Sequence, residues 1–201
     1  MSFPKAIQQL IDALTQLPDV GPKTAAKYAF FLNNQPQSVL DKLAQQIKVI
    51  KKDTSRCPQC FRIVETLSAK SLCSICIDAS RNSHTLLVIE KDTDSEPLEA
   101  AGYKGAYFVL GGLVATRTRS SFLKQRLSAL SKLVSDKTFK ELIIAFNPTP
   151  HGDATGNLIA QLLNDSSIKI TRLGRGLPTG ADLRYADKET LKGAFRGRTA
   201  L

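Results

Sequence analysis

The chain has 201 residues, of which 42% are hydrophobic and 23% are charged, so it can bury a globular core in one domain or in two compact ones. Its 28 Lys and Arg against 18 Asp and Glu give a formal net charge of +10. That charge favours an anionic partner such as nucleic acid, although a merely basic soluble protein would also carry it. The sequence has no apolar run long enough to span a membrane and no signal-peptide core near its start, so we expect a cytoplasmic protein.

The N-terminal segment predicts two helices joined by a short Pro/Gly turn. Apolar residues recur at helical spacing from Ile7 to Leu17, and Pro18 is expected to end that helix. Gly21 permits a tight turn, and Pro22 suits the first position of a second helix that continues to Leu32.

This pair of helices resembles the helix-hairpin-helix motif, in which free backbone N–H groups at the second helix point at a phosphate. Lys23 and Lys27 lie four residues apart, so they share one helix face and add positive charge there. Such a contact reads no bases, and we therefore expect sequence-independent, salt-sensitive DNA binding. Asp19 stands where the motif usually has glycine; aspartate can adopt a left-handed conformation, but its charge opposes a phosphate. The alternative is an ordinary helical hairpin with solvated lysines.

A third helix is predicted over Ser38–Lys52. Its apolar residues recur at helical spacing and predict one buried side, formed by Val39, Leu40, Leu43, Ala44, Ile47 and Ile50.

The four cysteines form two C-x-x-C pairs separated by twelve residues: Cys57, Cys60, Cys73 and Cys76. Each pair can offer two sulfurs from one tight turn, so the pattern predicts a four-thiolate zinc site with no open coordination position, hence a structural one. The spacer is short and leaves room for a small hairpin, with 62–67 returning through 68–72. Two disulfides are the alternative, and reduced cysteines in the cytoplasm argue against it.

From residue 85 onward the hydrophobic period changes to short apolar runs that alternate with helical stretches. Strands are predicted at 85–90, 106–110, 142–146 and 168–172, and helices at 96–101, 121–134 and 154–164. In the helix at 121–134, the side chains expected to face the sheet are Phe122, Leu123, Leu127, Leu130, Leu133 and Val134. This alternation predicts a parallel, doubly wound sheet.

Function in such sheets gathers at the carboxyl ends of the strands. Glu90 follows the first predicted strand, and Asp153 closes the segment Asn147–Asp153 after the third. Acidic oxygens at this edge are how a Toprim fold holds Mg²⁺. Asp153 could equally be the N-cap of the next helix.

The order of these modules, together with four segments, resembles the RecR family of bacterial recombination proteins. The segments are L-P-D-V-G-P-K, V-L-G-G, N-P-T-P-H-G-D-A-T and R-L-G-R-G-L-P-T-G-A-D-L-R-Y-A-D. The resemblance covers nearly the whole chain and implies a fold that combines α+β and α/β modules. Its implied parts are a helix-hairpin-helix region at 1–54, a four-cysteine zinc finger at 55–80, a Toprim domain at 81–173, and a Gly-rich loop with a C-terminal oligomerisation segment at 174–201.

The resemblance also implies a function: a non-enzymatic DNA clamp or mediator in recombinational repair. Family members act with RecO and RecF to help load RecA on single-stranded DNA, bind single- and double-stranded DNA without sequence preference, and assemble as dimers or tetrameric rings. It implies that the four cysteines hold zinc, that Lys23 and Lys27 contact DNA, and that Glu90 is the Toprim glutamate. The family carries two acids after N-P-T, whereas His151 here replaces the first and Asp153 keeps the second. Only two oxygen ligands remain, so tight Mg²⁺ binding is not expected, and the contact with RecO at that edge is expected to be altered.

Arg117 and Arg119 follow V-L-G-G where the family tends to have a P-L-x-G loop, and they are hypothesised to face a ring interior or a partner. Two functions from other classes stay open. One is a Toprim metal-dependent enzyme such as a primase, nuclease or topoisomerase, although the chain lacks a supported nucleophile. The other is a zinc-stabilised protein-interaction module.

Overall fold

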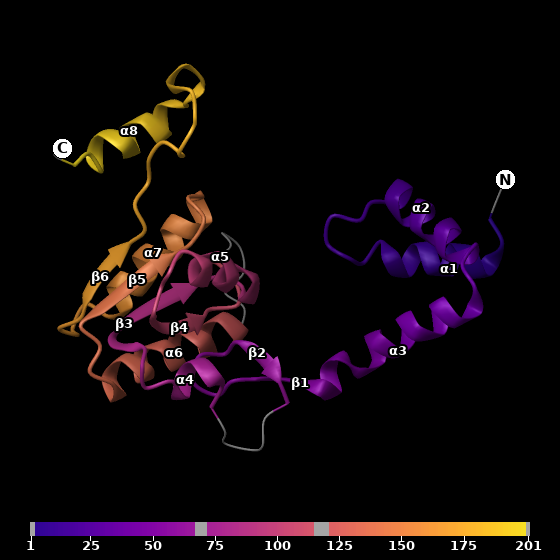
Figure 1. Ribbon diagram of the computed structural model, residues 1–201, viewed down its shortest axis with the longest axis horizontal. Helices are drawn as coiled ribbons and strands as arrows, with labels where there is room; N and C mark the ends of the chain where they lie inside the picture. The colour runs from indigo at the N-terminus through magenta and orange to yellow at the C-terminus, as the bar shows by residue number, and fades with distance from the viewer. Residues whose placement is uncertain (1–2, 67–71, 115–120, 200–201) are drawn as a thin grey trace. The chain divides into compact units, whose positions relative to one another are not determined.

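The computed structural model describes residues 3–66, 72–114 and 121–199 (Figure 1). Arg117 and Arg119 lie outside these residues. The chain divides into two compact units, Met1–Thr54 and Ser55–Leu201.

The first unit contains three helices: α1 (Lys5–Leu14), α2 (Pro22–Asn33) and α3 (Gln37–Asp53). Ile11 of α1 is buried against Ala25 and Ala29 of α2, and the small alanines let the two helices approach closely. The predicted helical hairpin is confirmed, with Pro22 at the first turn of α2. Helix α1 ends at Leu14 rather than at Leu17, because a turn stabilised by Leu17 N–H donating to the Leu14 carbonyl leads into the hairpin.

Helix α3 forms as predicted, but its predicted burial is wrong. Ile47 is 65% exposed, and none of the six residues of its apolar side is buried. The apolar side of α1 already packs on α2, so the core of this unit is complete without α3. We call the large exposed residues of this side the α3 stripe; they are Val39, Leu43, Ile47 and Ile50.

The second unit is built on a four-stranded sheet of β3 (Asn82–Ile89), β4 (Gly105–Val109), β5 (Glu141–Ala145) and β6 (Lys169–Arg172). The strand order is β4-β3-β5-β6, and every pairing is parallel, which confirms the predicted sheet. Strand β3 lies in the middle, so its last four residues are buried on both faces.

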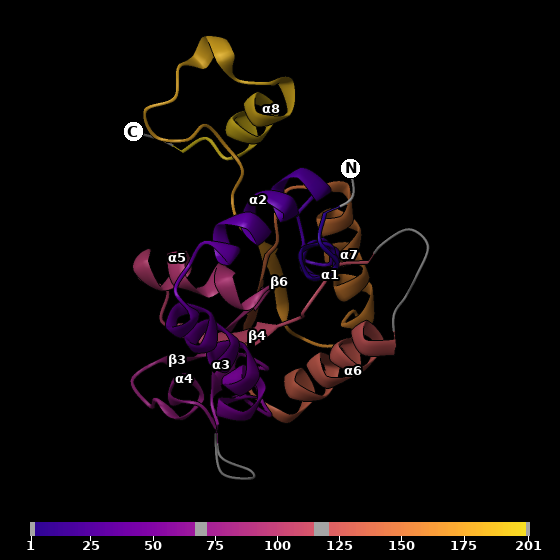
Figure 2. The ribbon, with the colours of Figure 1, turned by 90° about the vertical axis from the view of Figure 1, so that its right-hand side faces the viewer.

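Helices cover both faces of this sheet, as Figure 2 shows. Helix α5 (Ser95–Ala100), preceded by the short turn η1 (Asp92–Asp94), lies on one face; α6 (Ser121–Asp136) and α7 (Pro150–Leu162) lie on the other. Alternate residues of β3 serve the two cores, with Leu86 and Val88 facing α6 and α7, and Leu87 and Ile89 facing α5. The side of α6 predicted to face the sheet does so, except that Phe122 is 41% exposed.

The cysteine segment contributes β1 (Thr54–Arg56), β2 (Ile63–Glu65) and the one-turn helix α4 (Ser74–Ile77). Strand β2 pairs with β1, which precedes the first cysteine pair. Most of the return segment predicted at 68–72 falls outside the described residues, so a hairpin inside the spacer stays a prediction.

The tail contains η2 (Leu183–Tyr185) and α8 (Lys188–Arg196). Asp187 caps α8, because its carboxylate accepts hydrogen bonds from the N–H groups of Glu189 and Thr190, both at 2.9 Å. Tyr185 of η2 and Phe195 of α8 are 85% and 70% exposed, so the tail presents apolar side chains that its own unit does not cover.

Candidate functional site

The four cysteines gather at one point, as their spacing predicts. The Sγ atoms of Cys57 and Cys76 are 3.8 Å apart, those of Cys60 and Cys73 are 3.6 Å apart, and all four lie within 4.8 Å of one another. Sulfurs at the corners of a tetrahedron around a zinc ion, each about 2.3 Å from it, would be about 3.8 Å apart. The cluster therefore fits one tetrahedral metal ion. Disulfide sulfurs would be about 2.05 Å apart, so the alternative of two disulfides does not hold.

Two backbone turns produce this geometry. In the first, Phe61 N–H donates to the Cys57 carbonyl and Cys57 N–H donates to the Arg62 carbonyl, both at 2.9 Å. Phe61 closes that turn in the left-handed conformation, with φ of 62°. In the second, Cys73 precedes α4, and Cys76 N–H donates back to its carbonyl at 2.9 Å. Each turn brings two sulfurs to the same side of the backbone.

The thiols show why this cluster suits a cation. A hydrogen bond from Cys76 lowers the pKa of the Cys60 thiol to about 6, whereas burial raises the pKa of Cys73 to about 11. The hydrogen bond that Cys76 gives to Cys60 raises its own pKa, and burial adds to that rise. This group of neighbouring buried thiols therefore loses one proton readily and resists the loss of further protons. Four thiolates require a central metal ion.

The cysteine segment is attached firmly to the sheet. The Cys60 carbonyl accepts a hydrogen bond from Val109 N–H of β4 at 2.8 Å. The ring of Phe61 meets that of Phe108 edge-on, with centroids 5.3 Å apart. On the far side of the turn, the Asp92 carboxylate accepts from Ile63 N–H. The metal cluster and the carboxyl end of β4 are therefore parts of one packed body.

Arg126 packs against this attachment, and sequence reasoning did not identify it. Its guanidinium lies 3.6 Å from the centroid of the Phe61 ring and 4.9 Å from that of Phe122, and the residue is only 6% exposed. Among the described residues its Nη1 has no hydrogen-bond partner, and burial lowers its pKa. In the sequence, Arg126 has the pattern of an ordinary polar residue on an amphipathic helix. Its burial depends on contact with the cysteine segment, and only knowledge of that contact would have identified it.

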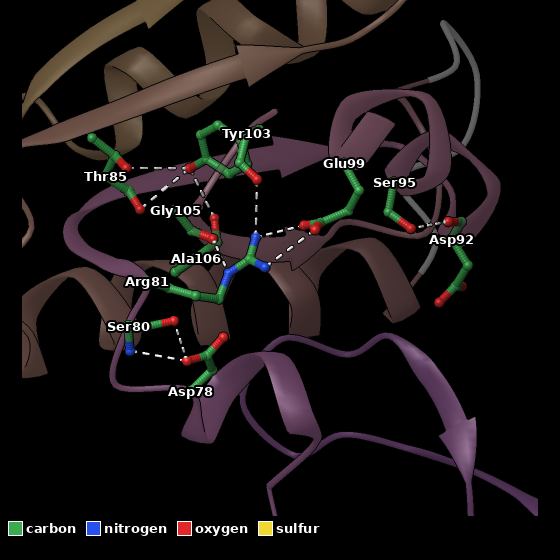
Figure 3. Close-up of polar contacts among 10 residues, drawn as sticks. All are labelled: Asp78, Ser80, Arg81, Thr85, Asp92, Ser95, Glu99, Tyr103, Gly105 and Ala106. Carbon is green, nitrogen blue, oxygen red and sulfur yellow. Dashed lines mark hydrogen bonds and ion pairs between the residues drawn. The ribbon is translucent and has the colours of Figure 1, made fainter. Parts of the chain in front are cut away.

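A second arginine joins the start of β3 to the opposite face of the sheet (Figure 3). Arg81 pairs with Glu99 of α5 through two hydrogen bonds of 2.5 and 3.2 Å. It also donates to the carbonyls of Gly105 and Tyr103. The hydrogen bonds from Arg81 lower the pKa of the Glu99 carboxyl, against an opposing effect of burial.

The helical hairpin presents the two lysines as the sequence predicts. Lys23 and Lys27 are exposed on one face of α2, a helix that contains no acidic residue. Among the described residues no side chain caps the N-terminus of α2, which leaves its first amides open to an anion. Asp19 adopts the left-handed conformation with φ of 62°, the backbone geometry for which the motif usually uses glycine.

The acidic residues at the carboxyl edge of the sheet are arranged differently from a metal site. Asp153 pairs with Arg172 at 3.2 Å and, through a shorter contact, with Arg175; these pairs lower the pKa of its carboxyl, Arg175 contributing most. Glu90 follows β3 and lies 3.9 Å from the Lys91 ammonium. His151 points elsewhere, with Nδ1 3.1 Å from the Val114 carbonyl.

Asp153 is also not the N-cap of α7, the alternative considered for it. Thr149 takes that place and accepts from Gly152 N–H at 3.1 Å, and α7 begins at Pro150, earlier than the predicted start at Ala154. In the described part of the chain, the four cysteines form the one group of three or more His, Cys, Asp or Glu that could hold a metal ion.

None of the helices that the structure describes combines the length and apolar character needed to cross a membrane.

Comparison with known proteins gives three family matches along the chain. A model described as "RecR, helix-hairpin-helix" matches residues 7–50, one described as "Toprim domain" matches residues 84–174, and one described as "RecR, C-terminal" matches residues 176–199. Among curated relatives, the "Recombination protein RecR" of Lactobacillus acidophilus is 36% identical and aligns over 100% of both chains. That of Bifidobacterium adolescentis is 37% identical over 100% of this chain and 99% of its own. That of Dehalococcoides mccartyi is 37% identical over 96% of this chain and 93% of its own.

Proposed function

The chain belongs to the RecR family of recombination proteins, and from this premise we propose that it is a DNA-binding factor of recombinational repair without catalytic activity of its own. The observation that carries the proposal is the face of α2. Lys23 and Lys27 stand exposed beside an uncapped helix N-terminus, in the segment matched by the family's helix-hairpin-helix model. Backbone amides and lysines recognise phosphates whatever the base sequence, so single- and double-stranded DNA should both bind.

Within repair, we propose that the chain acts as a clamp or mediator that works with RecO and RecF to help load RecA on single-stranded DNA. The four parts predicted from the sequence divide this work. The helical hairpin contacts DNA, the cysteine segment and sheet form the body, and the tail joins copies.

A clamp around a duplex needs several copies, because one chain of 201 residues cannot close around it. Two surfaces support self-association. The α3 stripe exposes 44–65% of each of its four aliphatic residues, and the tail exposes Leu183, Tyr185 and Phe195. We propose a dimer or a tetrameric ring built through these surfaces. Sedimentation of Ile47→Asp and Phe195→Asp variants tests this, since each should lower the oligomer size through its own interface.

The metal of the cysteine cluster is proposed to be zinc in a structural role. All four positions are cysteines, so no site stays open for a substrate. Cys57, Cys60, Cys73 and Cys76 would hold the ion, which supplies the charge that keeps four buried thiolates together.

The carboxyl edge of the sheet is proposed to serve as a protein-contact surface rather than as a tight Mg²⁺ site. Asp153 is already neutralised by Arg172 and Arg175, and His151 cannot replace the missing carboxylate while it points at the Val114 carbonyl. Of the two predicted oxygen ligands, Glu90 and Asp153, only Glu90 would remain to be offered to a cation. Titration with Mg²⁺ should therefore give weak binding at best.

One experiment separates a clamp from a Toprim enzyme. The protein is incubated with Mg²⁺ and labelled DNA, and both the mobility and the length of the DNA are measured. Retarded DNA of unchanged length supports the clamp, whereas cleavage, relaxation or primer synthesis overturns it.

The residues of the DNA contact are tested by replacing Lys23 and Lys27 with alanine. Each lysine that neutralises a phosphate contributes about 0.9 to the slope of log affinity against log salt concentration on duplex DNA. In the double variant, the magnitude of this slope should therefore fall by nearly two. The variant should also bind all DNA sequences more weakly, by the same factor. A matched control replaces Lys137 and Lys140, two exposed lysines of the second unit. Equal effects in the two variants, or no effect of the first, would rule out the helical hairpin as the contact.

A further inference from the structure

Helix α2 exposes aromatic rings as well as lysines. Tyr28 is 45% exposed, Phe30 is 41% exposed and Phe31 is 61% exposed. Large apolar rings usually leave water on folding, and three of them in one helix of 12 residues are not used by the core of this unit. They are available for a contact outside the chain.

The spacing places part of this aromatic surface beside the lysines. Lys23, Lys27 and Phe31 follow one another every four residues, so they form one row along the helix, and Tyr28 lies three residues before Phe31. The buried side, Ala25 and Ala29, is on the opposite face. We call Tyr28 and Phe31 the aromatic row. Phe31 lies beside Lys27, and Tyr28 flanks Phe31 on the side away from the lysines.

Phe30 differs from the other two rings. It meets Phe3 edge-on at 5.2 Å with an interplanar angle of 78°, so part of its surface is already used within the unit. Among the described residues no aromatic ring contacts Tyr28 or Phe31. Tyr28 and Phe31 are 45% and 61% exposed, so part of each side chain can be reached from solvent.

The chemistry of the aromatic row separates it from the α3 stripe. The stripe is aliphatic, and branched aliphatic side chains suit contact with another protein surface. The aromatic row combines flat rings with two cations and has no acid on the same helix. Rings interleaved with positive charge are how proteins hold single-stranded nucleic acid, because every base offers a face for stacking while lysines hold the phosphates.

We propose that Tyr28 and Phe31 stack on unpaired bases of DNA whose phosphates are held by Lys23 and Lys27. This inference rests on the proposed DNA contact of the helical hairpin and assigns it a preferred substrate class. Paired bases are stacked inside a duplex and cannot offer their faces to these rings. The hairpin therefore favours single strands, and the single-strand side of a junction, over continuous duplex.

The test compares two strands with the same phosphates, an oligothymidylate of 20 nucleotides and an abasic strand of equal length. Stacking by two rings should make the full-length wild-type protein bind the oligothymidylate roughly tenfold or more tightly than the abasic strand. In the Tyr28→Leu, Phe31→Leu variant, which keeps apolar volume, this ratio should fall to near one. The salt slope and the affinity for duplex should stay as in the wild type, because the lysines are unchanged.

Two further variants keep the result unambiguous. The Tyr28→Phe, Phe31→Tyr variant retains both rings and should retain the ratio. A control, Phe122→Leu, removes a ring of the second unit that is 41% exposed and should also retain it.

The proposal is overturned if the leucine variant binds DNA with an unchanged ratio. It is likewise overturned if that variant changes the sedimenting size and not the ratio, because the rings would then belong to an interface between copies. Failure of the DNA contact itself has a different signature: the Lys23 and Lys27 double variant would bind both strands as the wild type does.

Discussion

Replacing Glu99 with glutamine should measure the strength of the pair that joins α5 to the start of β3. The change keeps the size and hydrogen-bonding capacity of the side chain and removes its charge. Arg81 would keep its bonds to the carbonyls of Gly105 and Tyr103 but would lose its only described anionic partner, on a side chain that is 9% exposed.

The magnitude follows from the burial of the two partners. Removing one member of a fully buried pair costs about 3–5 kcal/mol, whereas exposed pairs contribute about 0–1 kcal/mol. The Glu99 side chain is 30% exposed, so water already screens part of the interaction. We expect a loss of about 2 kcal/mol in the free energy of unfolding, intermediate between these limits. For a unit of about 150 residues this corresponds to a fall in Tm of about 6 °C.

The pH dependence gives the sharper assay. The pKa of Glu99 is lowered in the folded protein, so its contribution is present above the ordinary glutamate pKa of about 4.3 and is lost as pH falls through the folded value. Scanning calorimetry of the wild type and the variant should show a gap at pH 7 that closes in acid, where the wild-type carboxyl is also protonated.

The reasoning would be refuted by a gap that stays constant from pH 7 into acid, which would mean that shape and not charge matters. A control replaces Glu189, whose side chain is 78% exposed and pairs with Lys192, which is 48% exposed. This change should alter stability by less than about 0.5 kcal/mol.

Three further predictions concern the second unit. Cys73→Ser should lower the bound zinc, measured by elemental analysis, from one ion per chain to well below one, and a chelator should destabilise the wild type far more than this variant. Arg126→Met should leave stability within about 1 kcal/mol of the wild type or raise it, because it removes a buried cation with an unpaired Nη1; a large loss in calorimetry would instead mean that its ring contacts dominate. Gly152→Ala should cost more than about 2 kcal/mol, since its Cβ would lie 2.3 Å from the Asn147 carbonyl oxygen, while Gly174→Ala, which meets open space, should be nearly neutral in denaturant titrations.

Local patterns predicted most of the elements because they depend on neighbours in the sequence. The cysteine spacing is sufficient to locate the metal cluster, since each pair closes within one turn. The parallel sheet was predicted from the alternation of helical stretches with apolar runs such as the one at 85–90, which are typical of strands buried on both faces. Asp19 took the left-handed conformation that its side chain tolerates.

The features that sequence reasoning missed depend on partners far along the chain. Periodicity in α3 indicated an apolar side correctly, but it cannot say whether another surface of the same chain covers that side. Arg126 is buried because Phe61, more than sixty residues earlier, lies over it. Asp153 is occupied by Arg172 and Arg175 for the same kind of reason, since β6 and the following segment bring both arginines to the edge of the sheet.

The hydrogen bond from Val109 to the Cys60 carbonyl has a consequence for solubility. Strand β4 is at the border of the sheet, and an unshielded border strand can recruit a strand from another molecule. The cysteine turn blocks that recruitment at the end of β4, and the proposed zinc would help it to keep its shape. Stripped of metal, the protein should begin to precipitate through this border while its helices are still intact.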